Sequence, residues 1–160
     1  MPHGVAAAPP STTPPGSVLG KMLDQHVGAY MRSFAVALPF AILAMWVLRN
    51  TLPHGFLMAW AAGFLGINLV RAMAARHFSQ TPPEKRIEHV WALRATAGHG
   101  LGGATWGVLG AGTIVLAPGS PEYSLIIFFI FTIFATFQAA NPSRYPPAYW
   151  AWTLGAVGPT

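Results

Sequence analysis

The sequence predicts an all-α protein: a polytopic membrane helix bundle with four complete spans, a truncated fifth span and a disordered N-terminal tail. The first reason is composition, since 53% of the 160 residues are hydrophobic and only 8% are charged, against about 25% charged residues in a soluble domain. The second is that the apolar residues form runs close to the ~20 residues that cross a hydrocarbon core. The third is that basic residues flank those runs. Lipid is therefore the expected solvent for most of the chain.

The first 28 residues contain no apolar run. They open with MPHGVAAAPPSTTPPGS, which is rich in Pro, Ala, Ser and Gly, a composition typical of disorder. A secretory signal would need a positive charge before its apolar segment, whereas Lys21 follows the short Val18-Leu19 pair. Residues 1–28 are therefore predicted to be a disordered cytoplasmic tail, with a short interfacial helix over 17–28 as the alternative. Residues 29–160 are the predicted transmembrane helical domain.

Four apolar stretches are predicted to span the bilayer completely. They cover residues 30–48, 56–75, 95–117 and 123–140. Another begins at Pro146 and is still apolar at AYWAWTLGAVGPT, with no charged flank to anchor it. We therefore expect a fifth span and a domain that are truncated at the C-terminus.

The start of the third helix carries a separate prediction. Thr81-Pro82-Pro83-Glu84 has the hydroxyl, the early prolines and the third-position carboxylate of a capping box. A helix from Pro82 to Ala117 would be about 54 Å long, nearly twice a ~30 Å hydrocarbon core. Its first turns must therefore lie outside the lipid or break before it.

The distribution of basic residues predicts the orientation. Lys and Arg stay on the cytoplasmic side during insertion, and with the N-terminus inside only Arg49 is external. The basic residues on the cytoplasmic side are Lys21, Arg32, Arg71, Arg76, Lys85, Arg86, Arg94 and Arg144. This predicts a multi-pass protein of the bacterial inner membrane with a cytoplasmic N-terminus. The net charge of +5 forms no stripe with interleaved aromatics, so nucleic acid is not an expected partner.

Small residues distinguish the third predicted span. Residues four apart let another backbone approach closely, which drives helix association in lipid. The predicted helix-packing residues are Gly98, Gly102, Gly103, Gly107 and Ala111. This span is expected at the centre of the bundle, against another span of the chain or of a second copy. The alternative is that the glycines only loosen the helix.

Three polar residues inside the spans are candidate sensing groups: Asn68, His99 and Thr105. Each costs free energy in hydrocarbon unless it is partnered. His99 is predicted to be hydrogen-bonded and structural, with a proton-sensing group or a haem ligand as alternatives. Arg71 is predicted to snorkel to the nearby cytoplasmic face.

Catalytic and cofactor signatures are absent from the sequence. It contains no cysteine, which excludes disulfides, thiolate metal sites and Cys nucleophiles. No HExxH or GxSxG motif and no pair of carboxylates occurs in a span. We therefore predict no catalytic residue, no metal and no cofactor, and no enzyme activity in this segment.

Four segments carry a pattern-level resemblance that covers about residues 29 to 160. They are the basic loop RHFSQTPPEKRIEHVWALR, the pair Trp106-Gly107 in GGATWG, the external APGSPEY, and the NPSRYPPAYW turn. In these features the chain resembles the N-terminal membrane region of proteobacterial hybrid sensor histidine kinases and GGDEF-type diguanylate cyclases. The resemblance implies a membrane region that passes a stimulus to a cytoplasmic catalytic module, usually as a dimer.

The expected function is therefore a sensory and anchoring input segment of a signal-transduction protein whose catalytic module is missing from this chain. Its expected partners are the lipid bilayer, a second copy in a homodimer and a downstream cytoplasmic signalling module. The full-length protein is then a histidine kinase or a diguanylate cyclase. The alternatives are a fragment of a small-solute transporter or channel, with Asn68, His99 and Thr105 lining a path, and a purely structural membrane anchor.

Overall fold

The computed structural model describes residues 17–119 and 145–159, seven positions between 123 and 133, and residues 31–33 by their backbone only. This part of the chain is all-helical and contains no strand. Its helices are α1 (Val18–Leu48), α2 (His54–Gln80), the short 3-10 helix η1 (Pro83–Lys85), α3 (Glu88–Leu116) and α5 (Pro146–Val157). Most of the fourth predicted span, 123–140, lies outside the described residues.

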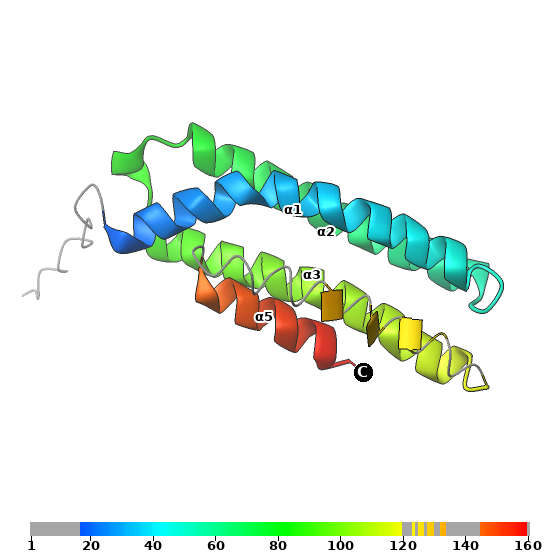
Figure 1. Ribbon diagram of the computed structural model, residues 1–160. Helices are drawn as coiled ribbons and strands as arrows, with labels where there is room; N and C mark the ends of the chain where they lie inside the picture. Colours follow the sequence, from blue (N-terminus) through cyan, green and yellow to red (C-terminus); the bar gives the residue numbers. More distant parts are fainter. Residues whose placement is uncertain are drawn as a thin grey trace, which may run out of the picture.

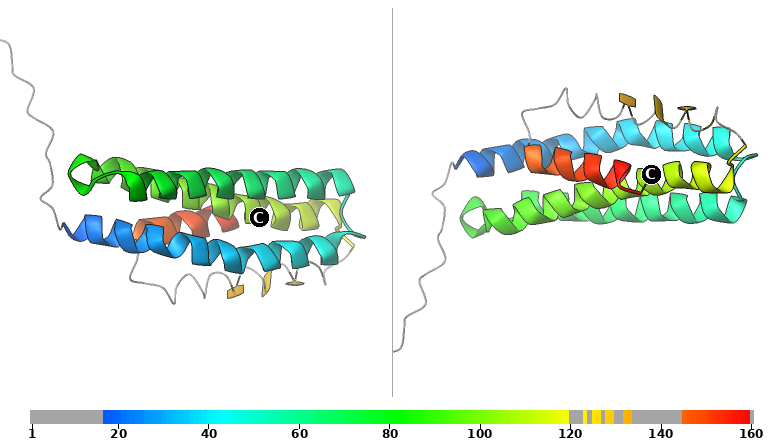
Figure 2. Two further views of the ribbon diagram at one scale, coloured as in Figure 1. Left: turned by 90° about the horizontal axis from the view of Figure 1, so that it is seen from above. Right: turned by 90° about the horizontal axis from the view of Figure 1, so that it is seen from below.

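The three long helices run side by side, each antiparallel to the next (Figure 1). The start of α1, the η1 link and the start of α3 lie at one end of the bundle, which we call the η1 end. The opposite end, the turn end, holds the α1–α2 turn at residues 49–53 and the end of α3. The short helix α5 lies beside α3 (Figure 2). It runs parallel to α3, because Gly100 lies against Ala151 while Gly107 approaches Ala156.

The first helix begins earlier than predicted. Ser17 caps α1, since its Oγ accepts a hydrogen bond from the amide of Gly20 at 2.9 Å. Leu23 is then buried with Phe78 and Trp91, and this burial offsets the low helix propensity of the glycines at positions 20 and 28. The disordered tail predicted for 1–28 is therefore wrong from Ser17 onward. Residues 1–16 lie outside the described part of the chain.

The predicted capping box at Thr81 is also wrong. Thr81 closes α2 instead: its Oγ1 donates to the carbonyl of His77 at 2.8 Å, and its amide donates to His77 and Phe78 at 3.1 Å. Two consecutive prolines follow, and the residue before each is held extended, so η1 is short and α3 begins only at Glu88. The chain thus breaks between α2 and α3, one of the two outcomes expected for an overlong third helix.

One described helix, α2, is long and apolar enough by itself to cross a bilayer. The helix α1 is a second if its segments Val18–Tyr30 and Phe34–Leu48, which meet at 44°, are counted as one span. The helix α3 has the length, at 29 residues, but its glycines add little apolar surface. By length and composition the described residues therefore contain one or two such spans, where the sequence predicts four complete ones.

The buried side chains form two apolar clusters. The larger lies toward the turn end and centres on Trp60, Phe64 and Trp106, with ring centroids 5.5 to 5.8 Å apart. The smaller, at the η1 end, is formed by Leu23, Phe78, Trp91 and Ala92. Polar side chains of α1, α2 and α3 meet between the two clusters, and this is the candidate site.

Candidate functional site

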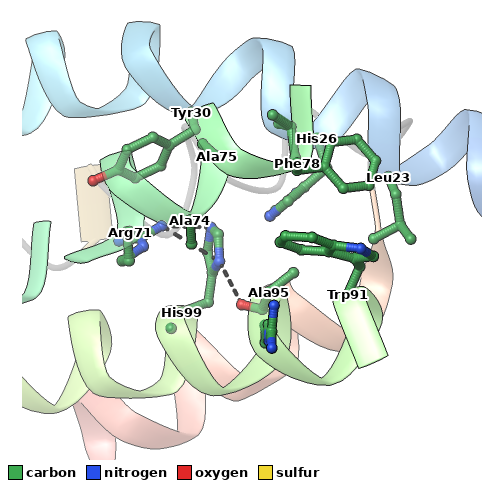
Figure 3. A pocket seen from close by; sticks show the side chains of 13 residues that line it. Leu23, His26, Tyr30, Arg71, Ala74, Ala75, Phe78, Trp91, Ala95 and His99 are labelled. Atoms are coloured by element: carbon green, nitrogen blue, oxygen red, sulfur yellow. Dashed lines mark hydrogen bonds between the residues drawn. The ribbon is translucent and has the colours of Figure 1, made fainter. Parts of the chain in front are cut away.

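A pocket of about 60 Å³ lies where α1, the end of α2 and the start of α3 converge (Figure 3). It lies near the bend of α1, which follows Tyr30. Its apolar walls are Leu23, Val27, Phe78 and Trp91 with three alanines. Its polar lining consists of His26, Tyr30, Arg71, Arg94 and His99. The pocket is partly open on one side and accommodates a group of only a few heavy atoms.

Arg71 and His99 connect α2 to α3. The guanidinium Nη2 of Arg71 lies 2.8 Å from His99 Nε2 and 3.3 Å from Nδ1, and Nδ1 lies 2.9 Å from the carbonyl of Ala95. One tautomer of His99 satisfies both hydrogen bonds: Nδ1–H donates to the carbonyl of Ala95, and Nε2 accepts from the guanidinium. A neutral imidazole is therefore the form that fits this geometry.

Tyr30 and Asn68 connect α1 to α2 beside that pair. The hydroxyl of Tyr30 donates to the backbone carbonyl of Asn68 at 2.7 Å and lies 3.1 Å from its Oδ1. The amide of Asn68 donates to the carbonyl of Phe64 at 2.8 Å, so this buried side chain is satisfied. The guanidinium of Arg71 lies 4.6 Å above the centre of the Tyr30 ring, which adds a cation–π contact.

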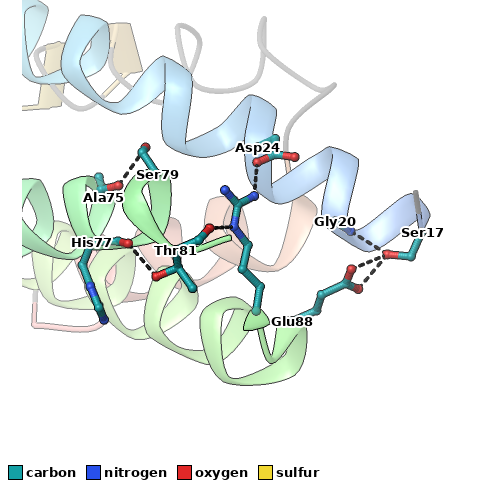
Figure 4. A network of polar contacts seen from close by, with 9 residues as sticks. Ser17, Gly20, Asp24, Ala75, His77, Ser79, Thr81 and Glu88 are labelled. Atoms are coloured by element: carbon teal, nitrogen blue, oxygen red, sulfur yellow. Dashed lines mark hydrogen bonds and ion pairs between the residues drawn. The ribbon is translucent and has the colours of Figure 1, made fainter. Parts of the chain in front are cut away.

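Positive charge dominates the pocket. The His26 ring lies 4.5 Å from the His99 ring, and the guanidinium of Arg94 lies 4.8 Å from the centre of the Trp91 ring. Among the residues that the structure describes, no carboxylate lines the pocket. Two of the nearest carboxylates are engaged elsewhere at the η1 end (Figure 4): Asp24 pairs with Arg86 at 2.8 Å, and Glu88 accepts from Ser17 at 2.7 Å.

Arg71 does not snorkel as predicted. It turns inward because His99 offers an acceptor and Tyr30 offers an aromatic face. No role was predicted for His26 or Tyr30, which also belong to this site. A signal for them exists: His26 and Tyr30 are four residues apart on α1, and Asn68 and Arg71 are three apart on α2, so each pair shares a helix face.

The three predicted sensing residues do not share one path. Asn68 and His99 both belong to the polar junction, through Tyr30 and Arg71. Thr105 lies farther along α3, where its carbonyl accepts from Trp60 Nε1 at 2.6 Å and its hydroxyl donates to Gly102 at 2.7 Å. It lines a separate groove between α2 and α3 that does not include His99.

The predicted packing glycines face two different neighbours. A methyl group at Gly98 or Gly102 would meet the Arg71 side chain, at 3.2 Å from Cγ and 2.9 Å from Nη1. A methyl group at Gly103 would overlap the carbonyl oxygen of Trp152, and one at Gly107 would lie 2.7 Å from that of Ala156. One pair therefore makes room for Arg71 and the other for α5 of the same chain. Ala111 is partly buried farther along α3.

The site offers little to a metal or haem in this arrangement. Among the described residues, no three His, Asp or Glu side chains are grouped to hold a metal ion. The Nε2 atom of His99, which would face an iron, is occupied by Arg71. What the arrangement does offer is hydrogen-bond donors and positive charge.

Comparison with protein-family models, curated proteins and solved structures finds no match.

Proposed function

We propose that this chain is a multi-pass, membrane-embedded input segment of a signalling protein, in which the polar junction of Tyr30, Asn68, Arg71 and His99 couples the movements of the helices. The observation that carries the proposal is that this junction of hydrogen-bonded polar side chains lies inside a bundle whose exterior is apolar.

Membrane embedding is supported by the surface of α2. Its outward side chains Met58, Leu69, Val70 and Met73 are 63–66% exposed, whereas Asn68 and His99 are buried. Exposed apolar surface on this scale is unfavourable in water and favourable in lipid. Polar groups in a membrane face the bundle interior and pair with one another, as these do.

A cytoplasmic N-terminus and a position in the bacterial inner membrane are supported by the charges at the two ends of the bundle. The described basic residues at the η1 end are Lys21, Arg76, Lys85, Arg86 and Arg94, against Arg49 at the turn end. Positive charge is retained in the cytoplasm.

A sensing role is supported by the way the helices are connected. Tyr30 joins α1 to α2, Arg71 joins α2 to α3, and backbone contact at Gly103 joins α3 to α5. A displacement of one helix is therefore passed to the others through discrete contacts. The resemblance to sensor kinases and diguanylate cyclases extends the proposal to a homodimer and a downstream cytoplasmic module. A transport path gains no support, because Asn68 and His99 lie apart from Thr105.

The absence of native cysteines makes the topology directly testable. Asn50→Cys at the turn end should react with a membrane-impermeant maleimide in spheroplasts, and Glu84→Cys in η1 should react only after lysis. Leu109→Cys, at a fully buried position, serves as the control and should react in neither case. Equal labelling of both exposed positions in intact spheroplasts would contradict the membrane proposal.

Signalling is tested in the protein as the cell makes it, through autophosphorylation and cellular cyclic di-GMP. Gly103→Leu should change one of these outputs, because it separates α5 from α3. The matched control is Leu101→Ala, at an exposed position of the same helix. If neither output is detectable, or if Gly103→Leu changes neither of them, the sensory role is refuted while the topology result stands.

A further inference from the structure

The pocket at the polar junction has an unbalanced charge. Arg71 and Arg94 both line it, with His26 and His99 beside them and no carboxylate among the lining residues. Arg94 is exposed, whereas Arg71 is partly buried, and removing a cation from water costs several kcal/mol unless an opposite charge or strong acceptors compensate it. Neutral partners, the His99 ring and the Tyr30 face, meet only part of this requirement.

The acidic residues in the described part of the chain do not supply the missing charge. Three of the four acidic residues of the chain lie in that part. Asp24 pairs with Arg86, Glu88 binds Ser17, and Glu84 lies exposed in η1.

The shape and position of the pocket indicate the class of ion. Its volume of about 60 Å³ accommodates a single phosphate group. The rings of Trp91 and Tyr30 line it, and such amphipathic rings favour the level where lipid headgroups meet acyl chains. The apolar walls of Leu23, Val27 and Phe78 suit a ligand whose charged group continues into an apolar tail.

We propose that this pocket binds a phosphate group, that of an anionic phospholipid or free inorganic phosphate, between the guanidinium groups of Arg71 and Arg94. Guanidinium is the side chain best matched to phosphate oxygens. His99 is a positioning residue, because it holds Arg71 through Nε2. The lipid source rests on the proposed membrane placement, whereas the free-phosphate source does not. Bound phosphate would join α2 to α3 more firmly and so provide the input segment with a chemical stimulus.

The test uses the full chain reconstituted in nanodiscs of phosphatidylcholine, which has no net charge. Thermal unfolding is followed by tryptophan fluorescence with increasing inorganic phosphate, and separately with phosphatidylglycerol in the disc. Stabilisation by phosphate alone identifies the free ion as the source. Stabilisation by phosphatidylglycerol alone identifies the lipid, and ³¹P NMR should then show a shifted or broadened lipid signal. No stabilisation by either overturns the proposal.

Two variants separate the pocket from general surface attraction. Arg94→Gln changes an exposed pocket residue and should leave the fold intact; it should weaken binding about tenfold, as expected for one charged hydrogen bond. Lys85→Gln removes an exposed positive charge in η1, at the same end of the bundle, and should leave binding within about twofold. Equal losses in the two variants would show diffuse attraction and overturn the proposal. Cysteine labelling in spheroplasts reports separately on whether the membrane placement has failed.

Discussion

The polar junction and the contact between α3 and α5 hold helices together by opposite means. At the junction, long side chains such as Tyr30 and Arg71 reach across and form hydrogen bonds. At the α3–α5 contact, Gly100, Gly103, Gly107 and Gly155 have no side chains, and the backbones touch. In lipid, where no hydrophobic force drives helices together, these are the two available routes. A hydrogen-bonded junction can respond to an added ligand, whereas a backbone contact tolerates almost no change.

The largest expected effect is at the backbone contact. Gly103→Ala adds one methyl group that would overlap the carbonyl oxygen of Trp152, so α5 must shift. We expect a loss of about 3 kcal/mol in the free energy of unfolding, measured by tryptophan fluorescence in a detergent–denaturant titration. The matched control is Gly63→Ala, where the added methyl meets nothing within 4 Å. It should be neutral or stabilising by up to about 1 kcal/mol. Equal losses would show that the contact is not tight.

The next effect is at the junction. His99→Phe keeps a ring in the buried space but removes the acceptor of Arg71, and leaving a charged donor unpaired costs about 2 kcal/mol. His89→Phe, on the exposed side of the same helix, should change the free energy of unfolding by less than about 0.5 kcal/mol. A smaller loss for His99→Phe than for His89→Phe would mean that Arg71 has another partner.

The sequence predicts the helices better than it predicts their contacts. Apolar runs locate α2 and the main part of α1, since length and hydropathy are properties of each segment alone. The start of α1 at Val18 is missed because it depends on Leu23 packing against residues far along the chain. The prediction that Arg71 snorkels is wrong for the same reason. Whether an arginine snorkels or turns inward depends on whether another helix supplies an acceptor, and it is the fold that places His99 beside Arg71.

The glycines of α3 also show that the sequence does not reveal which neighbour a residue contacts. Their four-residue spacing predicts a packing face, but Gly102 and Gly103 are neighbours in sequence and so point about 100° apart around the helix. The spacing alone does not reveal that one faces Arg71 and the other α5. Most of the fourth predicted span and residues 1–16 lie outside the described residues, so those predictions remain predictions.

A smaller effect is expected at the hydrogen bond between Tyr30 and Asn68. Tyr30→Phe removes the hydroxyl that donates to Asn68 but keeps the ring under Arg71, so the expected loss is about 1 kcal/mol. Tyr149→Phe, on α5, is the control and should cost less than about 0.5 kcal/mol. Combined with His99→Phe, the Tyr30→Phe loss should deviate from additivity by about 0.5 kcal/mol or more if the two bonds act as one network through Arg71. Strict additivity would show that the two hydrogen bonds act independently.

The smallest expected effect is at the exposed ion pair of the η1 end. Asp24 and Arg86 lie 2.8 Å apart, with the aspartate side chain 59% exposed, and pairs of this kind contribute about 0.5 kcal/mol. Asp24→Asn keeps the shape and removes the charge, so its effect on the free energy of unfolding should be small and should vanish in high salt. The His99→Phe loss should persist in high salt, because that contact is buried. If Asp24→Asn cost more than His99→Phe, the charged η1 end would contribute more to the stability of the bundle than the polar junction does, which would contradict the proposal that the junction couples the helices.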